Sequence, residues 1–301
     1  MATSRAVPSF EGRRVLSLES RRATEVAALI TTFGGEPLVA PALRQVPLES
    51  NAEALDFAAA LMRGEFDIVI FLTGVGTREL VSVIEQAYSR QAFIAALTRT
   101  KVVARGPKPL AVLRELQVPV WIAVPEPNTW RELLAALDAT VEERPLGHPA
   151  AAMPETLLGG ARIAVQEYGV SNTELLDALR QRGAQVTRVP VYRWALPKDV
   201  EPLKNAVTAI ARGEVDVVLF TTGVQVVHLW QIVDQMVLEP DVRRELARAV
   251  IASIGPTTSE ELRRHGLVAD LEASHPKIGM LVREAAERSG DLLHTKRNTG
   301  I

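Results

Sequence analysis

Glycine and hydroxyl residues follow four apolar segments of this sequence, and they are the first candidates for chemistry. If each apolar segment is a strand and the turn after it opens a helix, the first N–H groups of that helix form a positively polarised site for carboxylate or phosphate. One such contact stabilises an anion by only ~0.3 to 1 kcal/mol, so several must converge. The candidate ligand-binding turns are Thr73-Gly74, Arg105-Gly106-Pro107-Lys108, Thr222-Gly223 and Gly255-Pro256-Thr257-Thr258-Ser259.

Two other interpretations of these turns stay open on the residues alone. Thr257, Thr258 and Ser259 have the residue types of helix caps, with Glu260 and Glu261 completing capping boxes. The run from Gly74 to Gly76 invites a nucleotide-loop interpretation, but the third glycine of the dinucleotide fingerprint is missing and no Walker sequence is present. The sequence therefore gives no positive sign of a nucleotide cofactor.

Tyr192 is the candidate acid. It is one of three tyrosines and lies in an extended segment that we expect to link two domains. A phenol with an ordinary pKa near ~10 keeps its proton at neutral pH and can donate it. The competing interpretation is an aromatic ring that packs on Trp194 or Pro190, and the residues alone do not separate the two.

The elements that must position these residues come from an internal duplication. Residues 63–75, RGEFDIVIFLTGV, recur as residues 212–224, RGEVDVVLFTTGV, with nine of thirteen positions identical and an offset of 149. Gly106-Pro107 recurs at Gly255-Pro256 with the same offset, and Arg14 recurs at Arg162 with an offset of 148. A period this long indicates duplicated domains rather than a solenoid.

Apolar strands alternate with helices along both copies, which predicts parallel sheets with helices on both faces. The first copy contains a predicted buried strand over residues 68–71 followed by a helix from about Thr77, and the second contains a strand over 217–220. Ligands bind beyond the carboxyl ends of such strands. The prolines at 41 and 47 frame a linker, and we expect the polar residues 289–301 to fray.

Composition excludes several classes of function. The chain has no cysteine, and its five histidines are scattered, so neither a thiolate site nor a histidine metal site is expected. A net charge of −2 gives no general attraction to nucleic acid or to anionic membranes. No apolar run reaches the ~18 residues of a membrane span, and no signal peptide is visible, so we expect a cytoplasmic protein.

Four segments resemble the uroporphyrinogen-III synthase family, and the resemblance covers residues 13–288. The most specific is Ile254-Gly-Pro-Thr-Thr-Ser-Glu-Glu-Leu262 ahead of Gly266. Three weaker marks accompany it: Phe71-Leu72-Thr73, Phe220-Thr221-Thr222 and Val191-Tyr192. The resemblance implies an α/β fold with two flavodoxin-like parallel-sheet domains, joined by a two-stranded linker, with the active site between them.

The family's domain arrangement implies an insertion. Carried over, domain 1 is residues 1–44 with 194–290, domain 2 is residues 45–193, and residues 291–301 are a C-terminal tail. The repeats by themselves suggest a different division, with a break near residue 150. A second function also remains open, a non-catalytic two-domain protein that binds a small anionic ligand.

The family's reaction converts hydroxymethylbilane, a linear tetrapyrrole, into uroporphyrinogen III with inversion of ring D and loss of water. The resemblance implies no cofactor, no metal, no nucleic acid and no membrane partner, and we expect a monomer. It assigns Tyr192 to departure of the hydroxyl. It assigns binding of the substrate's carboxylates to Thr73, Gly74, Arg105, Lys108, Thr222, Gly223, Gly255, Thr257, Thr258 and Ser259. The first copy departs from the family pattern at Arg105 to Pro109, which leaves an altered substrate open.

Overall fold

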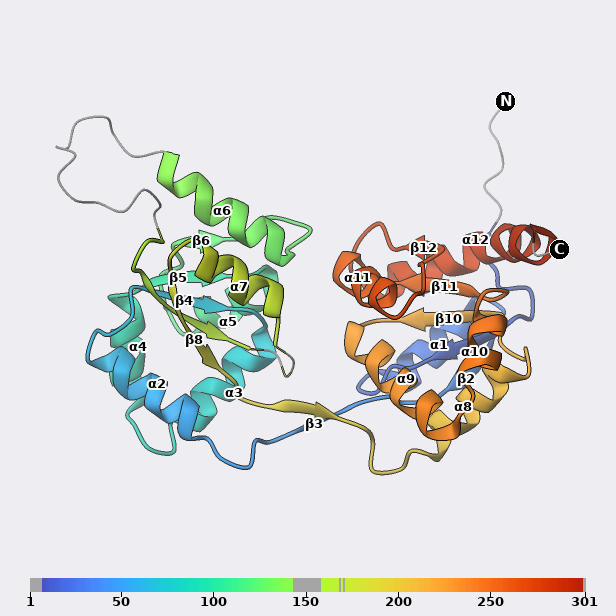
Figure 1. The fold of residues 1–301 in the computed structure, drawn as a ribbon, viewed down its shortest axis with the longest axis horizontal. Helices are drawn as coiled ribbons and strands as arrows, with labels where there is room; N and C mark the ends of the chain where they lie inside the picture. Colours follow the sequence, from blue (N-terminus) through green and yellow to red (C-terminus); the bar gives the residue numbers. More distant parts are fainter. Residues whose placement is uncertain (1–6, 143–157, 168, 170, 300–301) are drawn as a thin grey trace. The chain divides into compact units, whose positions relative to one another are not determined.

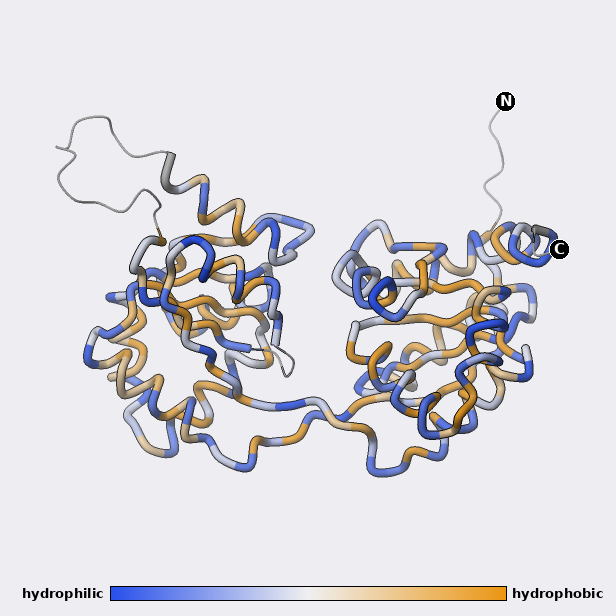
Figure 2. The backbone as a smooth tube through the Cα atoms, in the orientation of Figure 1, coloured by the Kyte–Doolittle hydropathy of each residue, from blue (hydrophilic) through white to orange (hydrophobic). Residues whose placement is uncertain are grey.

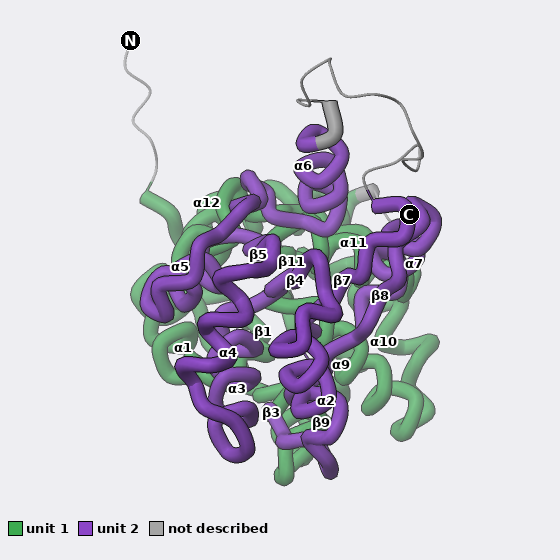
Figure 3. Tube along the Cα trace, turned by 90° about the vertical axis from the view of Figure 1, so that its left-hand side faces the viewer, with its two compact units in different colours: residues 1–44, 195–301 green, residues 45–194 purple. Residues whose placement is uncertain are grey.

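The computed structural model describes residues 7–142, 158–167, 169 and 171–299, and these form two α/β units (Figure 1). Unit 1 comprises residues 1–44 and 195–301, and unit 2 comprises residues 45–194 (Figure 3). Unit 2 is thus inserted into unit 1. The family resemblance placed the boundaries at 44/45 and 193/194.

The sheet of unit 1 has five strands in the order β12-β11-β10-β1-β2, all in parallel pairs. Numbered along the chain, this is the flavodoxin-like order 2-1-3-4-5. The elements of unit 1 are β1 (Arg14–Ser17), α1 (Ala23–Thr32), β2 (Glu36–Val39), α8 (Glu201–Ala211), β10 (Val217–Phe220), α9 (Gly223–Met236), α10 (Glu239–Leu246), β11 (Val250–Ser253), α11 (Pro256–Arg264), β12 (Leu271–Glu272) and α12 (Ile278–Thr299).

The sheet of unit 2 has the order β6-β5-β4-β7-β8, also in parallel pairs. It is the same arrangement with the chain order permuted, because β7 and β8 come last in sequence but occupy the places of β1 and β2. The elements of unit 2 are α2 (Ala52–Met62), β4 (Ile68–Phe71), α3 (Gly74–Ile84), α4 (Arg90–Thr98), β5 (Lys101–Ala104), α5 (Pro107–Glu115), β6 (Ile122–Ala123), α6 (Trp130–Glu142), β7 (Arg162–Gln166), α7 (Thr173–Gln181) and β8 (Gln185–Val189).

Each sheet therefore takes two strands from one repeat and three from the other. Strand β4 of the first repeat pairs with β7 of the second, and β10 of the second pairs with β1 of the first. The predicted fold class is confirmed, whereas a division near residue 150 is wrong because it would separate β4 from β7. Strands β3 (Arg44–Val46) and β9 (Arg193–Ala195) form a two-stranded sheet where the chain passes between the units (Figure 1).

Equivalent aspartates fix both cross-repeat pairs. The Asp67 carboxylate accepts from the Arg162 backbone N–H at 2.8 Å, and the Asp216 carboxylate accepts from the Arg14 N–H at 2.9 Å. The Arg162 guanidinium also donates to Asp67, and this hydrogen bond is the main reason that the pKa of Asp67 is lowered. Both aspartates belong to the duplicated thirteen-residue segment, so the duplication preserves the contact that joins one repeat to the other.

Alternating side chains of the strands build a core on each face of each sheet. In unit 2, Val69 and Phe71 pack against α2, α3, α4 and α5, whereas Ile68 and Ile70 pack against α6 and α7. In unit 1 the corresponding clusters use α8 to α11 on one face and α1 with α12 on the other. Figure 2 shows the hydrophobic colour concentrated along these strands.

Two local predictions are wrong. Helix α3 begins at Gly74 rather than near Thr77, because Thr73 caps it. The expected frayed tail is helical through Thr299, where α12 buries Leu293 to 4% exposure. Lys296 donates to Asp270 at 2.6 Å and Arg297 donates to Asp216 at 2.7 Å, so the end of α12 is tied to the sheet of unit 1.

We expect Leu293→Ala to lower the free energy of unfolding of unit 1 by about 2 to 5 kcal/mol, because it opens a cavity under α12. Urea denaturation followed by circular dichroism measures the change. His294→Ala, at the exposed neighbouring position, is the control and should change stability by less than about 0.5 kcal/mol. Equal effects of the two variants would contradict a docked α12.

Candidate active site

The predicted ligand-binding turns all lie at carboxyl ends of parallel strands. In unit 2 they follow the neighbouring strands β4 and β5, and in unit 1 they follow β10 and β11. Parallel strands end at the same edge of a sheet, so each pair of turns forms one rim. The unit 2 rim comprises Thr73, Gly74, Arg105 and Lys108, and the unit 1 rim comprises Thr222, Gly223, Gly255, Thr257, Thr258 and Ser259.

Close backbone contact holds the unit 2 rim together. A Cβ on Gly74 would lie 2.8 Å from the Lys108 carbonyl oxygen, so the starts of α3 and α5 touch and only glycine fits. Gly106 has φ 95°, and a Cβ there would lie 2.8 Å from the Asn128 side chain. Arg105 is half-buried and Lys108 is exposed. Two helix N-termini and two cations at one edge suit binding of carboxylates.

The unit 1 rim is built from the starts of α9 and α11. A Cβ on Gly223 would lie 3.0 Å from the Glu261 Cβ, so the start of α9 packs against the second turn of α11. Gly255 is the N-cap of α11 and provides no side chain. Thr257, Thr258 and Ser259 therefore lie inside the first turn, and the interpretation of these residues as caps is wrong.

The three hydroxyl residues of α11 have different surroundings. Thr257 is exposed and Thr258 is 4% exposed. Ser259 is 2% exposed, and its hydroxyl donates to the Glu272 carboxylate at 2.5 Å. Ser259 thus joins α11 to β12, and Thr257 and Thr258 are the better placed candidates for binding a ligand.

Thr73 and Thr222 occupy equivalent positions but are bonded differently. The Thr73 hydroxyl accepts from the Gly76 N–H at 3.1 Å and caps α3. Thr222 is the N-cap of α9 without a side-chain cap, and the described residues provide no hydrogen bond to its hydroxyl. The Thr222 hydroxyl is therefore available to a ligand, whereas that of Thr73 is engaged by the fold.

Two carboxylates behind the rims were missed by sequence reasoning. Glu19 accepts from the Thr221 hydroxyl at 2.7 Å and from the Arg21 N–H at 3.1 Å. Glu167, 4% exposed, accepts from the Arg188 guanidinium at 2.9 and 3.0 Å, and this hydrogen bond raises the pKa of Arg188. The two glutamates stand 148 residues apart, the offset that relates Arg14 to Arg162, so extending the repeat would have found them.

Tyr192 lies in the apolar core of unit 2 and is 3% exposed. Its ring packs edge-to-face on Trp194, with centroids 5.4 Å apart and planes at 82°, so the predicted packing on Trp194 is confirmed. Gly169 has φ 87°, and a Cβ there would lie 2.8 Å from Tyr192 Cε2 and 2.7 Å from Trp194 Cδ1. The backbone at Gly169 thus closes over both rings.

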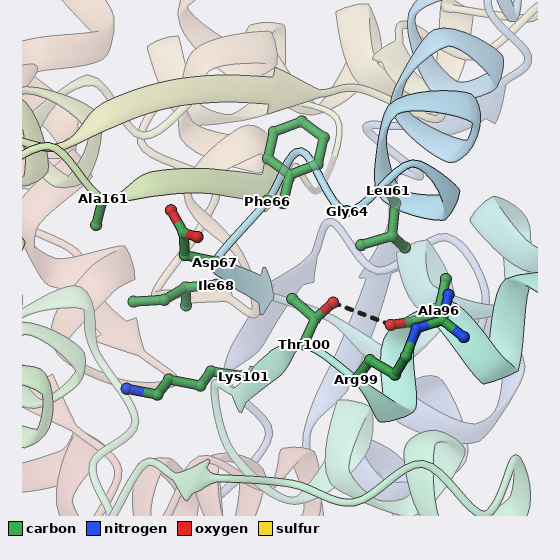
Figure 4. Close-up of a pocket in the computed structure, with 10 residues that line it drawn as sticks. All are labelled: Leu61, Gly64, Phe66, Asp67, Ile68, Ala96, Arg99, Thr100, Lys101 and Ala161. Carbon is green, nitrogen blue, oxygen red and sulfur yellow. Dashed lines mark hydrogen bonds between the residues drawn. The ribbon is translucent and has the colours of Figure 1, made fainter.

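A hollow of about 470 Å³ lies at the opposite edge of the unit 2 sheet (Figure 4). Asp67 and Lys101, at the starts of β4 and β5, line it, and it contains none of the predicted site residues. Arg99 and Lys101 extend in opposite directions in Figure 4, so their charges do not converge. Ala96 lines the hollow where the repeat places Glu245 in unit 1, so a small side chain accounts for the open space.

Neither a membrane helix nor a metal cluster occurs in the part of the chain that the structure describes. None of its helices is long and apolar enough to cross a membrane. Within the same residues, no three histidine, cysteine, aspartate or glutamate side chains gather as a metal site would require.

The comparison with protein families gives a match over most of the chain. Residues 24–283 match the model of uroporphyrinogen-III synthase HemD. The chain belongs to the uroporphyrinogen-III synthase family. This is a family of cyclising lyases in tetrapyrrole biosynthesis, so the alternative of a non-catalytic binding protein is not supported.

Individual relatives and solved structures match the chain over both units. An uncharacterized Bacillus subtilis protein, YjjA, is 27% identical over 277 residues, which are 92% of this chain and 96% of that protein. A mutant uroporphyrinogen III synthase from Thermus thermophilus has a TM-score of 0.69 at 26% identity, covering 93% of this chain and 100% of that one. The wild-type Thermus enzyme in another crystal form has a TM-score of 0.55 at 26% identity, covering 93% and 99%.

We expect the two equivalent threonines of this family member to differ in their effect on stability. Thr73→Val removes a helix cap and should lower the free energy of unfolding by about 1 kcal/mol, whereas Thr73→Ser keeps the cap and should not. Thr222→Val removes no cap and should change stability by less than about 0.5 kcal/mol. Urea denaturation of the three variants measures these effects, and equal losses from Thr73→Val and Thr222→Val would show that the two hydroxyls are equivalent.

Proposed function

We propose that this chain closes hydroxymethylbilane to uroporphyrinogen III, with inversion of ring D and release of water. The observation that carries this proposal is the likeness to the Thermus synthase over 93% of this chain and all of that one, at a TM-score of 0.69. The likeness extends through both units and therefore includes both rims.

The rims are suited to the substrate because it carries eight carboxylates. Thr222, Thr257 and Thr258 offer hydroxyl donors at the start of α9 and α11. Arg105 and Lys108 offer cations beside the start of α3 and α5, where they would pair with acetate or propionate groups. A substrate that can also close without the enzyme needs to be held in one folded conformer, and many fixed donors serve that task.

In this proposal Tyr192 is the acid. The Tyr192 hydroxyl donates a proton to the departing hydroxyl of the substrate, the C–O bond breaks, and water leaves. The pyrrole N–H proton then returns to the tyrosinate, which leaves the neutral azafulvene. Ring D then reacts at its substituted α-carbon, and fragmentation and recombination of the spiro intermediate invert it. The packing of Tyr192 against Trp194 and Gly169 fixes the direction of its ring, so a packed ring and a proton-donating hydroxyl do not exclude each other.

The product of the purified protein tests the proposed function. Freshly generated hydroxymethylbilane is supplied, the product is oxidised, and the type I and type III isomers are separated. We expect an excess of type III over the spontaneous type I product. Type I alone, from a protein whose circular dichroism shows it folded, would overturn the proposal.

We expect Tyr192→Phe to lower kcat by about 10² or more with little change in KM, because only the proton donor is lost. Tyr88→Phe, a half-buried tyrosine of the same unit, is the matched control and should keep full activity. Gly169→Ala should also lower kcat, because a Cβ at this position displaces the Tyr192 ring. Unchanged turnover in Tyr192→Phe would assign the residue to packing alone.

A further inference from the structure

Two buried glutamines lie beside the rims and have no part in the function described so far. Gln225 belongs to the first turn of α9 and Gln166 ends β7, and each is 1% exposed. Burying an amide is costly unless it is hydrogen-bonded, so we expect each side chain to hydrogen-bond to a neighbouring group. In both units that group belongs to the turn after the central strand.

The two glutamines are not equivalent in the duplication. Gln225 stands 149 residues after Gly76, and Gln166 stands 148 residues after Leu18. Each unit therefore has one buried glutamine beside its turn, but a helix provides it in unit 1 and a strand provides it in unit 2.

Steric exclusion in unit 2 explains why the strand, and not the helix, provides the glutamine there. A Cβ on Gly76 would lie 2.0 Å from Gln166 Nε2 and 2.6 Å from its Cδ, so residues 76 and 166 compete for one volume. Glycine at 76 is what admits Gln166. In unit 1 the larger residue is on the helix, and Leu18, fully buried, occupies the position of Gln166 in the apolar core.

In unit 1 the amide fixes the residue before Thr222. The Gln225 Oε1 accepts from the Thr221 N–H at 2.7 Å, and its Nε2 donates to the Thr221 hydroxyl at 2.8 Å. That hydroxyl in turn donates to Glu19 at 2.7 Å. The end of β10 is thus held by side chains of α9 and of the segment after β1, and the Thr222 hydroxyl takes no part.

In unit 2 the amide assists a turn that already has a cap. The Gln166 Oε1 lies 3.5 Å from the Thr73 N–H, and its Nε2 donates to the Glu167 carbonyl oxygen. The Gly76 N–H bonds to the Thr73 hydroxyl, as described above. The Thr73 hydroxyl therefore holds the unit 2 turn by a hydrogen bond, whereas the Gln225 amide holds the equivalent turn of unit 1.

We propose that Gln225 and Gln166 are positioning residues that hold the turns bearing Thr222 and Thr73 in place for the substrate. A helix provides the amide in unit 1, and a strand provides it in unit 2. This inference rests on the proposed function, because it assigns Thr222 and the first N–H groups of α9 to a substrate carboxylate. Gln225 acts through Thr221 and does not itself touch the substrate. Its loss affects binding rather than proton transfer at Tyr192.

Gln225→Leu tests unit 1, because it removes both hydrogen bonds at similar side-chain volume. We expect KM for hydroxymethylbilane to rise about tenfold with kcat within about twofold, and Thr222→Val to give the same pattern. Gln231→Leu, at an exposed position of the same helix, is the matched control and should leave KM unchanged. A merely structural role would lower the unfolding midpoint and leave KM of the folded protein at the parent value.

The outcomes separate this inference from the proposed function. A raised KM in Thr222→Val with a parental KM in Gln225→Leu overturns the positioning role alone. Parental KM in both variants overturns the assignment of Thr222 and the positioning role with it. The ratio of type III to type I isomer in the same samples reports independently whether the synthase function holds.

A rebuilt pair tests unit 2. Gly76→Gln and Gln166→Leu together give unit 2 the residue pair of unit 1, with Leu72 in place of Thr221, so that only the bond to the backbone N–H of residue 72 can form. We expect KM and the unfolding midpoint of the double variant to return toward the parent, with KM within about threefold. Each single variant should be worse, and Gly76→Gln should be worst because of the clash with Gln166. If Gly76→Gln alone does not fold, recovery of folding in the double variant supports the proposal for unit 2, and a double variant no better than the worse single variant overturns it.

Discussion

The constraint on which this molecule depends is the parallel pairing of each central strand with a strand of the other repeat. Asp67 and Asp216 accept hydrogen bonds from the backbone N–H groups of Arg162 and Arg14, and so set the register in which β4 meets β7 and β10 meets β1. Every neighbour relation at the carboxyl ends of these strands follows from that register. Glu19 can reach Thr221, and Gln166 can reach the Thr73 turn, only because the repeats are interleaved.

The duplication copied a scaffold, and the two rims have diverged on it. Unit 1 presents hydroxyl groups of Thr222, Thr257 and Thr258, whereas unit 2 presents the cations of Arg105 and Lys108. The buried residues behind the rims also differ between the units, as the pairs Leu18 with Gln225 and Gly76 with Gln166 illustrate.

The strands over 68–71 and 217–220 were predictable to the residue, because continuous apolar runs are bounded by the duplicated Gly-Glu-x-Asp and Thr-Gly. The start of α3 was not, because glycines at 74 and 76 have poor helix propensity and are retained for contacts with Lys108 and Gln166. The end of α12 was missed because its anchors, Asp216 and Asp270, lie far away in sequence. The Thr-Gly turns of the site could be predicted from local pattern. The contact of Glu19 with Thr221 could not, since these residues stand 202 positions apart and meet only through the pairing of β1 with β10.

The insertion of unit 2 also sets the order in which the chain can acquire structure during synthesis. All strands of unit 2 lie between residues 68 and 189, so its sheet can close as soon as β8 has emerged from the ribosome. Strand β1 cannot join its sheet this early, since the Arg14 N–H donates to Asp216, which lies 202 residues downstream. Strand β1 therefore pairs with β10 only after the inserted unit has been synthesised. Once unit 2 has folded, the pairing of β3 with β9 brings its two ends together, which shortens the effective loop between β1 and β10. The early folding of unit 2 thus prepares the completion of unit 1.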